Sequence, residues 1–388
     1  MKRILFVSVC FLQISLLAAI SGKEVADSLP FLKGEERWTK ERFVNFMASK
    51  GIRFNGSGTL LSAYLNKRRF FGVPAAEMRA SFDQEQFLDS IDIMYANKGD
   101  SAKDRNMNRT ISRNGKELHE NLTHLYGAPV KKKYGLKRIS NRGIGWNAGD
   151  SQIILEFVRQ EYVILHLFIG SKEKAAAVQQ HTVNAKKKDV TKQVKKNDFG
   201  DVYIADIPMV NQGNKGYCVP AAVERVLRHY GITSINMHYI ADKANTGRGG
   251  GTSMKNATQA LAPIGRAVNL DIVSTGDIRI SMIKKYVDKG VPVCWFMYNN
   301  QEYEAIRRAS RTRRKQIHSQ KAWIKELRNL RVPGKGEAHM CLVIGYNAET
   351  EEIAVSNSWG AHEIEPSWVP LRIAQKVSQG RTFVLYPR

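Results

Sequence analysis

Hydrophobic and polar positions in the first part of the chain predict two helices and a set of strands. Apolar residues recur at helical spacing from Trp38 to Lys50, and Gly51 follows, as glycine often does at a helix C terminus. A second helix is predicted over Gly115–Tyr126. Runs rich in β-branched and aromatic residues predict strands at 79–82, 87–95, 153–158 and 162–169. We therefore expect residues 23–170 to form a smaller α+β domain of unknown role with an antiparallel sheet.

The pattern becomes regular again after residue 200. Apolar residues at i, i+3 and i+4 predict a helix over Cys218–Tyr230, and another over Met254–Ala262, which Thr252 or Ser253 would cap. The glycines at 249–251 lack the order of a phosphate-binding loop, so we interpret them as the entry to that second helix. Strands are predicted at 202–207, 291–298, 339–346, 353–358 and 383–386. The third and fourth of these flank a polar turn and predict a hairpin.

A lysine-rich stretch separates the two regions. Residues 171–200 hold few large apolar side chains, and six lysines lie between Lys186 and Lys196. Such a composition buries little surface, so it predicts an exposed linker. The second domain is expected to span residues 201–388.

The first 22 residues have the pattern of a cleaved signal peptide. Lys2 and Arg3 precede an apolar stretch from Ile4 to Ile20, and Ala19 and Ser21 supply the small residues of a cleavage site. We expect the mature chain to be secreted or periplasmic, with no transmembrane span after cleavage.

Few cysteines remain once the signal peptide is removed, namely Cys218, Cys294 and Cys341. This number does not make a disulfide scaffold, and no metal-ligand spacing appears, so neither a metal nor a cofactor is expected. Cys294 and Cys341 fall in neighbouring predicted strands, where they either form a disulfide or pack as two buried thiols. The odd count leaves at least one thiol without a partner within the chain.

The chain is strongly basic, with a formal net charge of +24. The charge is spread along the sequence and no nucleic-acid-reading motif accompanies it, so specific nucleic-acid binding is not expected. A basic insertion at 299–337 carries eleven Lys or Arg against four Glu. It is either a solvated pair of charged helices or a lip that binds substrate, an anionic surface or an acidic protein.

Four residues of the second domain have the chemistry of a thiol nucleophile and its partners. Cys218 begins a predicted helix, where the dipole and free N–H groups lower a thiol pKa. His339 begins one strand of the predicted hairpin and Asn357 ends the other, so the two should face each other. Gln212, in the turn-rich loop before Cys218, could donate to an oxyanion together with the Cys218 N–H. Trp359 could shield the His–Asn bond from water.

These motifs resemble the papain superfamily of cysteine peptidases. The resemblance rests on Gln212 six residues before Cys218, on His339 before an apolar strand, and on the sequence Asn357-Ser358-Trp359-Gly360. It covers about residues 201–388. It implies a papain-like fold, with a helical half and an antiparallel β half, in which Cys218 is the nucleophile, His339 the base, Asn357 its orienting amide and Gln212 an oxyanion donor.

The sequence departs from papain itself around the nucleophile. The segment 216–222 (GYCVPAA) and Gly251-Thr252-Ser253 are more similar to the peptidases that process bacteriocin leaders, which usually orient the histidine with an aspartate. The chain is therefore placed among bacterial papain-like peptidases between these two groups.

The resemblance implies hydrolysis of a protein or peptide substrate. Two alternatives use the same residues: glutamine deamidation or acyl transfer, and a catalytically inactive peptide-binding module. The region 23–170 is expected to be either a removable inhibitory prodomain or a permanent targeting module.

Overall fold

The structure, a computed structural model, describes residues 29–33, 36–100, 106–136, 139–170, 189–247, 250–317, 319–331, 334–360 and 363–388. The described residues fall into two compact units, the first ending at residue 170 and the second beginning at residue 189. The predicted signal peptide lies outside the described residues.

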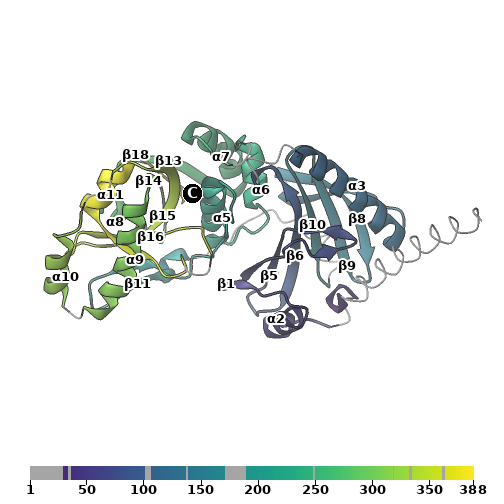
Figure 1. Ribbon diagram of the computed structural model, residues 1–388, viewed down its shortest axis with the longest axis horizontal. Helices are drawn as coiled ribbons and strands as arrows, with labels where there is room; N and C mark the ends of the chain where they lie inside the picture. Colours follow the sequence, from purple (N-terminus) through teal and green to yellow (C-terminus); the bar gives the residue numbers. More distant parts are fainter. Residues whose placement is uncertain are drawn as a thin grey trace, which may run out of the picture. The chain divides into compact units, whose positions relative to one another are not determined.

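The first unit is built on one antiparallel sheet (Figure 1). The elements before residue 171 are η1 (Pro30–Lys33), α2 (Lys40–Ser49), β1 (Asn55–Ser57), β2 (Leu60–Tyr64), β3 (Arg69–Phe70), β4 (Val73–Pro74), β5 (Glu77–Phe82), β6 (Leu88–Asn97), η2 (Lys98–Asp100), α3 (Met107–Tyr126), β7 (Val130–Leu136), β8 (Ile139–Ala148), β9 (Ser151–Val158) and β10 (Tyr162–Phe168). The eight-stranded sheet has the order β1-β2-β5-β6-β10-β9-β8-β7, and β3 pairs with β4.

Helix α3 covers one face of this sheet. It contacts β6, β8, β9 and β10, and its buried residues Ile111, Leu118 and Leu122 recur at helical spacing. The alternate residues Val163 and Leu165 of β10 belong to the same core. The helix begins earlier than the predicted Gly115 because Met107 and Ile111 extend its apolar stripe.

The second unit is also α+β, so the predicted fold class is confirmed in both units. The elements after residue 188 are η3 (Val190–Gln193), β11 (Val194–Lys196), β12 (Val202–Ile204), α5 (Cys218–His229), α6 (Met237–Lys243), α7 (Met254–Val268), β13 (Leu270–Gly276), α8 (Ile280–Val287), β14 (Val293–Asn299), α9 (Gln301–Gln316), α10 (Gln320–Leu327), β15 (Glu337–Asn347), β16 (Glu352–Ser356), β17 (Ser367–Pro370), α11 (Leu371–Val377) and β18 (Ser378–Pro387). The sheet has the order β11-β12-β15-β14-β18-β13, and β16 pairs with β15 and β17.

Two local expectations need correction. The linker does not extend to residue 200, because Val194–Lys196 forms β11 and pairs with β12. The strand predicted at 202–207 ends at Ile204, before Asp206, whose φ of 56° is incompatible with an extended strand. Helices α6, α8 and α11, each only seven or eight residues long, were not predicted.

The two cysteines of neighbouring strands are not bonded. Trp295 lies opposite Cys341 and Cys294 lies opposite Leu342, so the two thiols point to opposite faces of the sheet. Both are buried free thiols, which confirms the second of the two interpretations and makes the disulfide wrong.

The basic insertion is docked by buried ion pairs rather than solvated. Arg307 of α9 is 1% exposed and binds Glu363, while Arg314 binds Asp201 and Glu352. In α10, the Trp323 indole donates to the same Glu352. A solvated helix pair is therefore wrong for this segment, and part of its positive charge is neutralised inside the unit.

Candidate active site

The thiol of Cys218 lies at the first residue of α5, at the N terminus of the helix. Pro220 fits the first turn because a helix needs no N–H donor there. The backbone N–H groups of Val219 and Met340 and the imidazole of His339 all face the thiol and lower its pKa. The helix start and strand β15 thus converge on one sulfur atom.

The hairpin of β15 and β16 brings His339 to Asn357, as the sequence predicts. His339 lies in β15, opposite Met297 of β14, and Asn357 follows directly after β16. The Nε2 atom of His339 is 2.9 Å from Oδ1 of Asn357, so Nε2 carries the proton that the amide oxygen accepts. Both side chains are buried. The other ring nitrogen, Nδ1, is left for Cys218.

The side chain of Trp359 stacks on His339. The two ring centroids are 5.0 Å apart and the planes are inclined by 30°. On Trp359 lies Arg307 of α9, with Cζ 5.3 Å from the indole centroid. The insertion therefore reaches the predicted site by supporting the tryptophan.

Two opposing effects set the pKa values of Cys218 and His339. Burial alone would raise the pKa of the Cys218 thiol, but the hydrogen bond and charge of His339 outweigh it, and the pKa is lowered. Burial would also lower the pKa of His339, yet the bonds to Cys218 and Asn357 raise it. Both shifts favour a thiolate–imidazolium pair.

The Gln212 side chain is buried and fixed beside the helix start. Its Nε2 donates to the carbonyl of Lys215 at 3.0 Å, which also identifies which end of the amide is nitrogen. An amide has two N–H groups, so one remains for another acceptor. The Gln212 Oε1 is buried without a hydrogen-bond partner among the described residues. The Gln212 backbone N–H donates to the carbonyl of Ser358 at 2.8 Å, which ties this loop to the Asn357 segment.

The glycine cluster supports the loop before the nucleophile. A Cβ on Gly250, whose φ is +109°, would lie 2.1 Å from the Cα of Gly216. Gly251 N–H donates to the Gly216 carbonyl at 3.0 Å. Ser253 then caps α7, as the sequence predicts. Glycine is required here because two backbones approach closely.

Two buried arginines near these residues were not found by sequence reasoning. Arg225 lies in α5 and donates to the carbonyls of Ser356 and Asn357, while Arg307 lies behind Trp359. A charged residue on the buried face of an amphipathic helix is the only signal for Arg225. Its partners Ser356 and Asn357 are more than a hundred residues away in the sequence, and no local pattern links them to Arg225.

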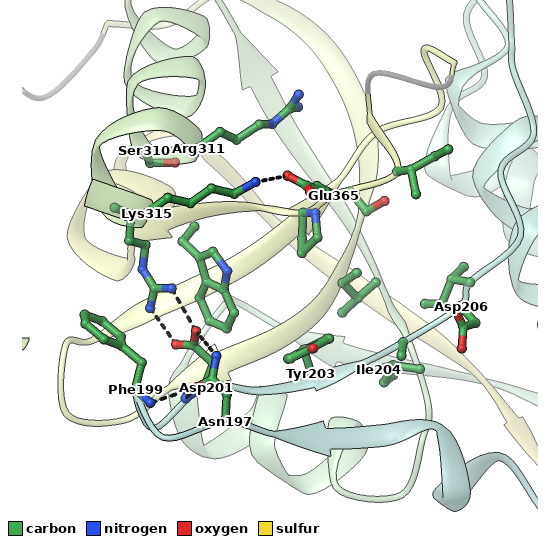
Figure 2. Close-up of a pocket in the computed structure, with 18 of the residues that line it drawn as sticks. Asn197, Phe199, Asp201, Tyr203, Ile204, Asp206, Ser310, Arg311, Lys315 and Glu365 are labelled. Carbon is green, nitrogen blue, oxygen red and sulfur yellow. Dashed lines mark hydrogen bonds and ion pairs between the residues drawn. The ribbon is translucent and has the colours of Figure 1, made fainter. Parts of the chain in front are cut away.

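A cavity of about 770 Å³ lies elsewhere in the second unit (Figure 2). Its lining comes from the segment around β12, the C-terminal part of α9 and the residues after Glu363. Lys315 and Glu365 form an ion pair there (Figure 2). Arg314, which also lines the cavity, binds Asp201. Neither Cys218, His339 nor Gln212 lines it, so this cavity is distinct from the predicted site.

The described part of the chain holds no cluster of three or more His, Cys, Asp or Glu side chains suited to a metal. No helix within the described ranges is long and apolar enough to cross a membrane.

Residues 204–376 match the Peptidase_C39 like family. Three solved structures are similar at low identity: the peptidase domain of Streptococcus ComA, described as a bi-functional ABC transporter involved in quorum sensing (15% identity, TM-score 0.30, 47% of this chain and 100% of that one); a C39-like peptidase from Bacillus anthracis (13%, 0.33, 48% and 98%); and xylellain, a cysteine protease from Xylella fastidiosa (12%, 0.28, 52% and 90%). No curated protein matches the sequence. The family match, rather than these distant structural likenesses, supports the assignment that follows.

Proposed function

We propose that the second unit is a cysteine-type peptidase of the papain-like superfamily and that it hydrolyses peptide bonds with Cys218 as nucleophile. The match of residues 204–376 to the Peptidase_C39 like family supports this proposal. The observation that carries the proposal is the contact of Cys218 with His339, whose other ring nitrogen is bound by Asn357. This arrangement supports the proposal, because a thiolate nucleophile needs a base beside it and a third group that orients the base.

In the first step the Cys218 thiolate attacks the substrate carbonyl carbon. The C–N bond breaks as imidazolium His339 transfers its Nδ1 proton to the leaving amine, which gives a thioester and neutral imidazole. Asn357 keeps the ring in the tautomer and orientation needed for this transfer.

Charge that develops on the substrate oxygen needs donors in place before the reaction. We assign this role to the Cys218 backbone N–H and to the second N–H of Gln212. The bond from Gln212 to the Lys215 carbonyl and the burial of the side chain support the assignment, because they fix the amide.

In the second step His339 accepts a proton from water, and the resulting hydroxide attacks the thioester. The carboxylic acid leaves, and the sulfur regains its charge as thiolate beside imidazolium. A deamidase would use the same residues on a glutamine side chain. An acyl transferase would use them with an amine, in place of water, as the acceptor. No feature of the site specifically favours either, so hydrolysis of protein or peptide substrates stands as the proposal.

The test combines hydrolysis with thiol labelling. We expect Cys218→Ala to abolish cleavage of a denatured protein substrate, and His339→Ala to reduce it almost as far, with both variants folded. An iodoacetamide-type probe should label Cys218 rapidly in the native chain. Wild-type turnover by Cys218→Ala would show that the nucleophile is wrong. Rapid labelling without cleavage would support an inactive binding module.

We also propose that the enzyme acts outside the cytoplasm, as a secreted or periplasmic protein. The support is the sequence of residues 1–22, with its basic start, apolar stretch and small residues. Expression of the full chain followed by N-terminal sequencing of the exported protein tests this, and intact Met1 in the cytosol would contradict it. We also propose that the insertion 299–337 binds an acidic protein or an anionic surface. Several of its arginines are used in internal ion pairs, so fewer of its basic side chains serve this binding.

A further inference from the structure

A buried cation joins the helix of Cys218 to the segment of Asn357. Arg225 lies about two helical turns after Cys218 and is 1% exposed. Its Nη1 donates to the carbonyl of Asn357 at 2.8 Å and to that of Ser356 at 3.2 Å. Its Nη2 donates to Ser356 Oγ at 2.6 Å, and its Nε to the carbonyl of Pro208 at 3.0 Å. All of these acceptors belong to segments that flank predicted site residues.

This arrangement is costly for stability. Among the described residues no carboxylate forms an ion pair with Arg225, and burial lowers the pKa of its guanidinium to about 10. An apolar side chain of similar size usually fills such a position at equal or better stability. The arginine therefore supplies something that packing alone does not, namely directed donors for carbonyl groups.

The carbonyl groups it binds lie where the sheet no longer fixes the chain. The pairing of β16 with β15 ends at Ser356, opposite Leu342, and Asn357 lies one residue beyond. Ser356 and Arg225 also line the 770 Å³ cavity. The guanidinium of Arg225 therefore supplies hydrogen bonds to the backbone where the pairing of β16 with β15 has ended.

We propose that Arg225 is a positioning residue that fixes the backbone of Asn357 relative to Cys218, and thereby aims the Asn357 amide at His339. It acts through Asn357 and makes no contact with substrate. This inference rests on the proposed function, because it assigns Arg225 a part in the same site.

The test is a double-mutant cycle with Arg225→Lys and Asn357→Ala. Lysine keeps the charge but cannot donate to both carbonyls and to Ser356 at once. We expect Arg225→Lys to lower kcat about tenfold to a hundredfold, the loss that removing a charged hydrogen bond typically brings, with KM nearly unchanged. In the Asn357→Ala background the same change should have almost no further effect on kcat, since the side-chain amide that Arg225 positions is gone. If the fold losses in kcat of the two single variants multiply in the double variant, the proposal is overturned.

A matched control in the same helix separates positioning from loss of stability. Arg228 is also buried, one turn further on, but it pairs with Glu224 at 2.7 Å and does not touch the Asn357 segment. Arg228→Lys should lower the unfolding temperature without a kcat loss that depends on Asn357. If both arginine variants lose kcat alike and both losses add to that of Asn357→Ala, Arg225 is merely structural. Ser356→Ala, which removes only one of the bonds, is the variant to use where Arg225→Lys does not fold, and the same cycle applies.

Alkylation of Cys218 as a function of pH keeps the inference separate from the peptidase assignment. The hydrogen bond to Asn357 helps to raise the pKa of His339. A misplaced Asn357 amide should therefore narrow the pH range in which the Cys218 thiol is reactive. Arg225→Lys and Asn357→Ala should therefore change this profile in the same way, whether or not a substrate is cleaved. An unchanged profile in Arg225→Lys contradicts positioning, whereas absent cleavage with altered profiles contradicts only the proposed function.

Discussion

Trp359 lies against His339 with ring centroids 5.0 Å apart, directly beside the His339–Asn357 hydrogen bond. An indole in this place keeps water away from a bond that water would otherwise weaken. Trp359→Ala should lower kcat about tenfold, the effect of losing roughly one hydrogen bond's net free energy, whereas Trp359→Phe keeps an aromatic face and should recover most of the rate. Equal kcat values for the alanine and phenylalanine variants would show that shielding is not the role.

Gln212 offers a test of the oxyanion donors that is independent of thiol activation. Gln212→Ala should cost about 10²–10³ in kcat, the usual effect of removing one such donor. Gln212→Glu is the matched variant, since it has nearly the same shape but no N–H to donate when ionised. Both should keep normal alkylation of Cys218, because alkylation develops no oxyanion. A loss of only a few-fold, or a parallel loss of alkylation, would contradict the role.

The pH dependence of thiol reactivity follows from the two shifted groups of the site. The pKa of Cys218 is lowered and that of His339 is raised, and both shifts favour the thiolate–imidazolium pair. Iodoacetamide should label Cys218 well below pH 8.5, the ordinary pKa of a thiol. Hydrolysis should decline on the acid side as the thiolate takes up a proton, and on the alkaline side as the imidazolium loses one. His339→Ala should shift the alkylation midpoint upward; a midpoint near 8.5 in the wild type would contradict the pair.

Cys294 and Cys341 serve as internal controls in that experiment. Both are fully buried and burial raises their pKa values. Native protein should therefore take up label at Cys218 alone, and both other thiols should react only after unfolding without reductant, since the strand register separates them.

The local part of the site could be predicted from the sequence, and its support could not. The hairpin that joins His339 to Asn357 and the helix that begins at Cys218 depend on short-range periodicity and turns, which a sequence displays directly. The contact of Arg225 with Asn357 spans 132 residues and depends on how α5 packs against β15, the strand that pairs with β16. Residue type alone gives no partner for a buried arginine.

The wrong predictions for the linker and for the basic insertion have a similar origin. Lysines at 186–196 suggested a solvated linker, yet a strand at the edge of a sheet needs only backbone pairing, and Lys195 and Lys196 remain exposed in β11. The charge of the insertion suggested a solvated pair of helices, but Glu363 and Glu352 provide buried partners that lie beyond it in the sequence. Composition predicts exposure only where no such partner exists.

The first unit contains a buried histidine, His166, whose positive charge should stabilise the folded unit. Burial opposes protonation of His166, but Asp92 at 2.7 Å and Glu156 at 3.1 Å outweigh it and raise the pKa to about 10. Because the folded pKa exceeds the unfolded value of about 6.5, the stabilisation is full below pH 6.5 and is lost as pH rises toward 10. The destabilisation caused by His166→Gln should therefore shrink between pH 6.5 and 10 in urea unfolding of this unit. A constant difference across that range would contradict a charged His166.

The last prediction concerns what the first unit does for the peptidase. Its own sheet and its helix-covered core form a complete unit, which exceeds what covering a cleft requires, so we expect a permanent module rather than an inhibitory prodomain. The comparison is between the full mature chain and residues 189–388, a boundary that keeps β11 paired with β12. Equal kcat/KM on one short peptide is the expected result, with equal Cys218 alkylation as the check that the truncated form is folded. A prodomain would instead make residues 189–388 much faster, and added residues 23–170 would suppress them. Either of these effects would overturn the permanent module, because a domain that never occupies the site cannot change the rate at which a small substrate is cleaved.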